Sequence, residues 1–135
     1  MGITVLDAGV LIAQTDASDA HHPRARTAML EAERRGELVA PATAFAEVMT
    51  GAYMAGPREV DTLSRFFETV VRVVPFTFGI AMTAARLRAD GRLKLADAAV
   101  IATGIELDAD VILTADRRWK KIDPRIQIVR VRPDT

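Results

Sequence analysis

The chain has 135 residues, half of them hydrophobic, and its 18 basic and 18 acidic residues leave no net charge. This length suits a single domain spanning residues 1–135, and the apolar content is sufficient for a core without disulfides or metal staples. The chain has no cysteine, which excludes a disulfide framework and a thiolate metal site, and its neutral charge balance argues against nucleic-acid binding by bulk charge alone.

The apolar pattern predicts strands that alternate with helices along the whole chain. Short, mostly apolar runs such as Ile3–Leu6 are typical of buried parallel strands, whereas Ala25, Ala28, Met29 and Ala32 recur at the spacing of one helical face. In chain order we expect a strand at Ile3–Leu6, a helix at His22–Gly36, a strand at Leu38–Ala40, a helix at Ala42–Met54, a helix from Pro57 to Val71, a strand at Arg72–Pro75, a helix at Phe78–Asp90, a helix followed by the strand Val111–Thr114 within Lys94–Asp116, and a last strand at Ile126–Val131.

Two of these helices carry clear apolar faces. The first face consists of Phe45, Val48, Met49, Ala52 and Tyr53, and the second of Val60, Leu63, Phe67, Val70 and Val71. Phe66 lies off the second face, so it is either a contact with a partner protein or part of a wider core.

Strands alternating with helices predict an α/β fold. We expect a three-layer sandwich in which a central, mainly parallel β-sheet is flanked by helices. Ligands in such folds bind outside the carboxyl ends of the strands, so chemically active residues are sought there.

No segment resembles a membrane span or a targeting signal. The longest uncharged run, from Val73 to Ala85, contains Pro75 and is shorter than the ~20 residues that a transmembrane helix needs. No basic stretch precedes an apolar one at the amino end. We therefore expect a soluble cytoplasmic protein with no membrane association.

Four acidic residues share one kind of position in the predicted fold. Asp7 follows the first strand, Asp116 follows the strand Val111–Thr114, and Asp97 and Glu47 lie early in helices. Each has a structural explanation as well, because aspartate caps helices and acids in a first helical turn complement the helix dipole. All four side chains could nevertheless meet at the carboxyl edge of the sheet.

Clustered carboxylates repel one another, and a divalent cation would remove this repulsion. Mg²⁺ and Mn²⁺ prefer carboxylate and water oxygens, and Mg²⁺ completes its shell with substrate phosphate. One or two such ions can orient a water molecule and stabilise charge during in-line phosphoryl displacement. The acids therefore favour metal-assisted hydrolysis of phosphodiester bonds.

Four motifs of the chain resemble the acidic motifs of the PIN domain, in the family's order. They are "VLDAGVLIA" (Val5–Ala13), "ATAFAEVM" (Ala42–Met49), "LADAAVIATG" (Leu95–Gly104) and "ILTADRRW" (Ile112–Trp119). The compact length also resembles the VapC toxins of type II toxin–antitoxin pairs.

The resemblance implies a Mg²⁺- or Mn²⁺-dependent endoribonuclease, with one or two ions per site. Asp7, Glu47, Asp97 and Asp116 would be the metal-binding acids, and Thr114 matches a hydroxyl residue that orients a water or a carboxylate. The implied substrates are structured RNAs such as transfer RNA or ribosomal RNA. The implied partners are a VapB-like antitoxin and a second copy of the chain in a homodimer.

Two features modify this picture. Gly9 stands where the family usually has Ser, Thr or Asn, so a hydrogen bond that tunes metal affinity is expected to be missing. Basic residues flank the proposed site in two runs, and those we expect to contact substrate phosphates are Arg86, Arg88, Arg117 and Arg118.

Other functions remain open. A phosphatase of the haloacid-dehalogenase type would need a second aspartate at the position of Gly9. A receiver domain would need a strand ending in a central aspartate, although Thr114 and Lys121 would be loose candidates for its other residues. The main alternative is a catalytically degenerate PIN-like module that only binds RNA or a partner, with the acids acting as caps.

Overall fold

A computed structural model describes residues 2–129. Its centre is a five-stranded sheet with the strand order β3-β2-β1-β4-β5, in which every neighbouring pair is parallel. The strands are β1 (Gly2–Leu6), β2 (Gly36–Pro41), β3 (Arg72–Val74), β4 (Val111–Thr114) and β5 (Ile126–Ile128). The α/β class and the parallel sheet predicted from the sequence are therefore confirmed.

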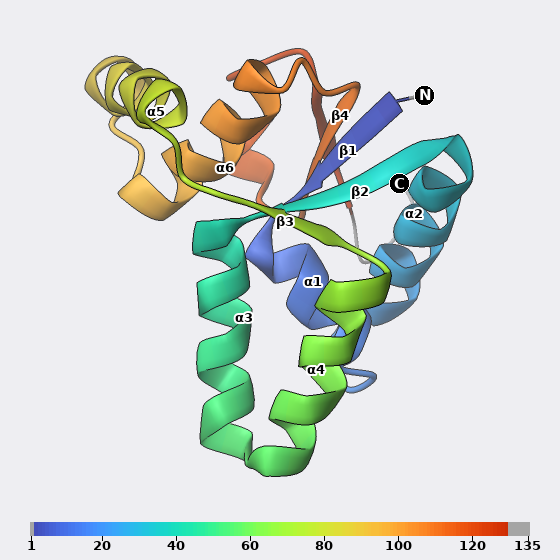
Figure 1. The fold of residues 1–135 in the computed structure, drawn as a ribbon. Coiled ribbons are helices and arrows are strands. Elements are labelled where there is room, and N and C mark those ends of the chain that lie inside the picture. Colours follow the sequence, from blue (N-terminus) through green and yellow to red (C-terminus); the bar gives the residue numbers. More distant parts are fainter. Residues whose placement is uncertain (1, 130–135) are drawn as a thin grey trace.

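Helices cover both faces of the sheet and complete the three layers (Figure 1). They are α1 (Ala8–Thr15), α2 (His22–Arg35), α3 (Ala42–Ala55), α4 (Pro57–Thr69), α5 (Phe78–Gly91) and α6 (Leu95–Glu106), with the short 3₁₀ helix η1 (Arg117–Trp119) before β5. The chain moves from β1 to β2 to β3 in one direction along the sheet and then returns to β4. Because such crossovers are right-handed, α1–α4 cover one face and α5 and α6 the other, as the ribbon shows.

The central strands are buried on both faces, which explains their continuous apolar sequences. Val5, Leu6 and Ile112 are fully buried. Helix α6 is likewise buried over the whole stretch from Ala98 to Gly104. A Cβ atom at Gly104 would overlap the Ile112 side chain, so this glycine allows α6 to pack closely on β4.

The sequence did not predict α1. This helix begins directly after Asp7 with no intervening loop and has only eight residues, too few for a helical period to be distinguished from a buried strand. The run "VLIA" (Val10–Ala13) belongs to α1, and Val10, Leu11 and Ala13 are buried.

Two residues of the predicted apolar faces are exposed. Tyr53 is 71% exposed and Val70 38%. The α3–α4 hairpin extends well beyond the sheet (Figure 1), so the end of α3 has little to pack against. Phe66, in contrast, packs against the core and meets Phe67 edge to face at 5.5 Å, which favours the wider-core interpretation.

The remaining differences concern the ends of elements. The last strand is shorter than expected, and Arg130 and Val131, which the sequence assigned to it, lie outside the described residues. Within residues 2–129, no helix combines the length and the apolarity needed to cross a bilayer.

The topology itself marks one position on the sheet. The connection from β1 leads to β2 on one side, whereas β4 lies on the other side of β1. The carboxyl ends of β1 and β4 therefore flank the point where the strand order reverses, which is where ligands bind in open α/β sheets.

Candidate functional site

Asp7 lies at this reversal point. Its backbone N–H donates to the Leu113 carbonyl oxygen at 3.0 Å, which closes the β1–β4 ladder. Its backbone is extended, α1 begins at the next residue, and its carboxylate makes no capping hydrogen bond to the helix. The Asp7 carboxylate therefore makes no capping bond by hydrogen-bond geometry, although the Ala8 N–H at the start of α1 lowers its pKa, and its half-buried side chain is left for another role.

Thr114, the last residue of β4, links the ends of the two strands. Its hydroxyl donates to Asp7 Oδ2 at 2.7 Å and accepts the backbone N–H of Asp116 at 3.1 Å. The side chain is fully buried, so its rotamer is fixed by packing as well as by the two bonds. Thr114 therefore sets the position of the Asp7 carboxylate relative to the turn that carries Asp116.

The environment of Asp7 disfavours its charge. Burial raises the pKa of Asp7 from its usual value near 3.8 to about 6, although the hydrogen bond from Thr114 acts in the opposite direction. The negative charges of Asp97 and Glu47 raise this pKa further. A carboxyl group that titrates near neutral pH because of burial and neighbouring acids is typical of a functional site.

Asp97 occupies the first turn of α6 and is half-buried. The N-cap position of α6 is occupied by Lys94, so Asp97 is not the N-cap residue. No side-chain capping bond is made at this helix start. Burial and the charge of Asp116 raise the pKa of Asp97, while Arg118 and Lys94 lower it. Asp97 therefore lies within electrostatic reach of both Asp7 and Asp116.

Asp116 does have the structural role that its position suggested. Its Oδ1 accepts the backbone N–H of Arg118 at 2.9 Å and so caps η1. The Arg118 guanidinium also binds this carboxylate, and this hydrogen bond is the main reason that the pKa of Asp116 is lowered. Capping does not exclude a second role for the same carboxylate.

Glu47 is exposed on α3, and its negative charge raises the pKa of Asp7. The fold thus brings the four acids to one edge of the sheet as a series of neighbours. Asp7 interacts with Glu47 and Asp97, and Asp97 interacts with Asp116. Within residues 2–129, however, no three acidic or histidine side chains converge closely enough to form a preformed metal cage.

The donor set nevertheless fits a hard cation. It consists of carboxylate oxygens and a threonine hydroxyl, and Mg²⁺ typically uses only one or two protein carboxylates while it keeps several waters. Repulsion among the acids would also fall if a cation bound between them. The residues that could hold such an ion are Asp7, Glu47, Asp97 and Asp116.

The basic residues near the site divide into three groups. Arg88 donates from Nε to the Leu93 carbonyl at 3.2 Å, so it stabilises the turn between α5 and α6. Arg86 and Arg117 are exposed, and their phosphate contacts stay a prediction. Lys94 and Arg118 are the cations that act on the acids; Lys94 belonged to the same charged run as Arg86 and Arg88 but was not among the predicted substrate contacts.

Gly9 also adjoins the site. A Cβ atom at this position would lie 3.8 Å from Asp7 Oδ2, so a hydroxyl residue here would be within reach of the carboxylate. Thr114 is the side chain that supplies a hydroxyl to Asp7 instead.

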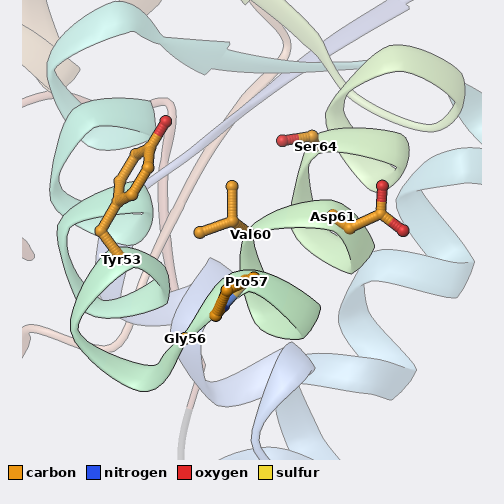
Figure 2. Close-up of a pocket in the computed structure, with 6 residues that line it drawn as sticks. All are labelled: Tyr53, Gly56, Pro57, Val60, Asp61 and Ser64. Carbon is orange, nitrogen blue, oxygen red and sulfur yellow. The ribbon is translucent and has the colours of Figure 1, made fainter.

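A separate groove lies in the α3–α4 hairpin. It has a volume of about 400 Å³ and is lined by Tyr53, Gly56, Pro57, Val60, Asp61 and Ser64. Figure 2 shows Tyr53 on α3 facing Val60 on α4 across this groove. None of the predicted site residues lines it, so the groove and the acidic edge are distinct features.

Comparisons with known proteins agree with the fold. A model of the PIN domain family matches residues 4–124. A toxin–antitoxin complex from Klebsiella pneumoniae contains a chain with a TM-score of 0.75 and 20% identity, and the alignment covers 92% of this chain and 95% of that chain. A comparison with curated proteins gives no match.

Two further solved structures have similar folds. One is VapBC2 from Rickettsia felis bound to a promoter DNA fragment, with a TM-score of 0.76, 12% identity, and coverage of 95% of this chain and 98% of that chain. The other is Mycobacterium tuberculosis VapC20, a toxin that cleaves the sarcin–ricin loop, with a TM-score of 0.67, 20% identity, and coverage of 81% and 86%. At these identities the structural likeness establishes the fold alone.

Proposed function

The chain belongs to the PIN domain family, whose model matches nearly its whole length, and from this premise we propose that it is a Mg²⁺- or Mn²⁺-dependent endoribonuclease that acts as the toxin of a VapBC-type pair. The observation that carries the proposal is the Asp7 carboxylate at the strand-order reversal, bound by Thr114 and raised in pKa by burial and neighbouring acids. A purely structural carboxylate would not be kept in a position that disfavours its charge.

The toxin role is supported by size and by similarity. Solved structures with this fold are described as toxin–antitoxin or VapBC complexes, and they match this chain over more than nine-tenths of both lengths. We infer that the partner is a VapB-like antitoxin.

The proposed chemistry follows from the donor set. One or two ions held by Asp7, Glu47, Asp97 and Asp116 would supply a polarised water and charge stabilisation at a phosphodiester. Thr114 fixes the carboxylate of Asp7, and because the pKa of Asp7 is raised to about 6, a proton competes with a cation for this carboxylate below about pH 6. Lys94 and Arg118 supply positive charge next to the acids, where phosphate oxygens of RNA would approach.

The test is cleavage of a mixed pool of structured RNAs, transfer RNAs included, by the purified protein with Mg²⁺, Mn²⁺ or excess chelator. Asp97→Asn is compared with Asp108→Asn, the same substitution at an acid beside the amino end of β4. Asp108 has a positive φ of 49°, which asparagine tolerates. We expect metal-dependent cuts that Asp97→Asn abolishes and Asp108→Asn preserves.

The degenerate-module alternative makes a different prediction in the same experiment. If the acids only cap helices, as Asp116 caps η1, the wild-type protein will neither cut RNA nor bind Mn²⁺ in a titration. Mn²⁺ binding without any cut would instead indicate that the substrate is missing from the pool. Equal cutting by wild type and Asp97→Asn would contradict the assigned site.

A further inference from the structure

Arg118 occupies both oxygens of a proposed metal ligand. Its Nε donates to Asp116 Oδ1 at 3.0 Å and its Nη2 donates to Asp116 Oδ2 at 2.7 Å. This is the two-pronged geometry in which guanidinium groups bind carboxylates and phosphates. The Arg118 side chain is 78% exposed, whereas that of Asp116 is 22% exposed, so the contact is open to solvent from the arginine side.

The same guanidinium also acts on Asp97. Asp97 and Asp116 repel each other, and Arg118 offsets part of this repulsion at both acids. Arg118 therefore places a positive charge within electrostatic reach of both carboxylates. The polar contacts of its side chain within the described residues are those to Asp116.

We propose that Arg118 is an exchangeable counter-ion: it neutralises Asp116 before a divalent cation binds, and on cation binding it moves to a phosphate of the RNA. This inference rests on the proposed function. The cation and the guanidinium require the same Asp116 oxygens, so they compete. An exposed ion pair is weak, so its displacement costs little.

The backbone around Arg118 keeps the released side chain in place. The Arg118 N–H stays bound to Asp116 Oδ1, and the neighbouring Trp119 is buried. The guanidinium can therefore swing away from Asp116 but remains beside the site. A phosphate offers it the same two-pronged contact that the carboxylate provided.

This exchange couples the binding of metal and of RNA. A cation on Asp116 frees Arg118 for RNA, and RNA that holds Arg118 leaves Asp116 free for the cation. By thermodynamic linkage each ligand must then increase the affinity for the other by the same factor.

The first test is calorimetric titration of Mn²⁺ alone into wild type, Arg118→Gln, Arg118→Lys and Arg72→Gln. Arg72→Gln is the matched control, because Arg72 makes the same two-pronged contact with a carboxylate, that of Glu37, at the amino ends of β2 and β3. We expect Arg118→Gln to bind Mn²⁺ about two- to fivefold more tightly than wild type, the range that loss of an exposed pair gives. Arg118→Lys, which keeps the charge but loses the fork, should fall between them.

The second test is binding of a fluorescent single-stranded RNA, followed by anisotropy with Mn²⁺ and with chelator. Wild type should bind RNA more tightly with Mn²⁺, and Arg118→Gln should lose most of that gain while Arg72→Gln keeps it. An Mn²⁺ affinity of Arg118→Gln equal to wild type, or an equal increase in Arg72→Gln, overturns the exchange while the proposed function stands. Failure of wild type to bind Mn²⁺ overturns both.

Discussion

The two edges of the sheet treat their acids differently. At the amino edge three acids are each bound by a donor, although two of them share one arginine. Asp110 Oδ2 accepts the backbone N–H of Ile3 at 3.1 Å, and Arg125 pairs with Asp108 at 2.9 Å and with Asp123 at 3.3 Å. Arg125 also donates to the Ala109 carbonyl, so these charges tie the approach to β5 to the start of β4.

At the carboxyl edge two cations, Arg118 and Lys94, act on the acids. Asp7 is bound by the Thr114 hydroxyl, and Asp116 by the guanidinium and the backbone N–H of Arg118. Asp7 and Asp97 nevertheless have raised pKa values, with burial as the first cause and neighbouring acids as a further one.

This difference separates structural acids from candidate functional acids. A carboxylate with matched donors stabilises the fold, whereas a half-buried one among other acids lowers stability when it is charged. Functional sites commonly retain such unfavourable arrangements because the chemistry requires them. The following predictions test whether the two edges differ as this comparison requires.

Of these predictions, the substitution Thr114→Val should have the largest effect, a loss of RNA cleavage. Valine keeps the volume of the buried side chain, but Asp7 loses its donor and the Asp116 N–H loses its acceptor. Loss of a residue that orients a metal ligand typically lowers affinity or activity by ~10–100-fold, and we expect a loss in that range in single-turnover RNA cleavage. Thr114→Ser, which keeps the hydroxyl, should stay close to wild type; an unaffected Thr114→Val would show that Asp7 needs no positioning.

The next effect is on stability and concerns Asp7→Asn. The folded-state pKa of about 6 exceeds the usual 3.8, so the fold binds the proton more tightly than the unfolded chain does. The protein should therefore lose stability as pH rises from about 4 to about 6, with a total loss of at most about 3 kcal/mol at pH 7. Asparagine cannot ionise and can still accept the Thr114 bond, so Asp7→Asn should be more stable at pH 7 and flatter across this window.

The measurement is urea unfolding of both proteins between pH 4 and 8 in chelator. The two proteins should differ little at pH 4 and most at pH 7. A parallel pH dependence for wild type and Asp7→Asn would mean that Asp7 is as well accommodated as the acids at the amino edge.

Much of the fold was predictable because its determinants are local. The central strands are buried on both faces and so read as apolar runs, and α6 is buried nearly all round. Helix α1 was missed because eight residues carry too little periodicity. Tyr53 was assigned to a buried face because periodicity reports which residues share a face, not whether that stretch of helix lies over the sheet.

The sequence predicted where the site residues lie on the sheet, but not which side chains contact one another. Strand ends and helix starts placed Asp7, Glu47, Asp97 and Asp116 at one edge, and the family resemblance added Thr114. The pairing of Arg118 with Asp116 depends on side-chain rotamers, which no sequence pattern specifies. The role of Lys94 beside Asp97 had only a weak signal, because charged runs are usually solvated surfaces.

The smallest expected effect is a loss of stability from a substitution at the amino edge of the sheet, Arg125→Gln. Arg125→Gln removes the paired cation from Asp108 and Asp123 and the donor from the Ala109 carbonyl. We expect urea unfolding at pH 7 to show a loss of about 1 kcal/mol, typical of such hydrogen bonds, with Arg117→Gln within about 0.5 kcal/mol of wild type as an exposed control.

Cleavage by fully folded Arg125→Gln should equal that of wild type, because its partners lie at the far edge from Asp7. A fall in cleavage without unfolding would instead mean that the amino edge controls the position of β4 and hence of Thr114, and the two edges would then form one coupled unit.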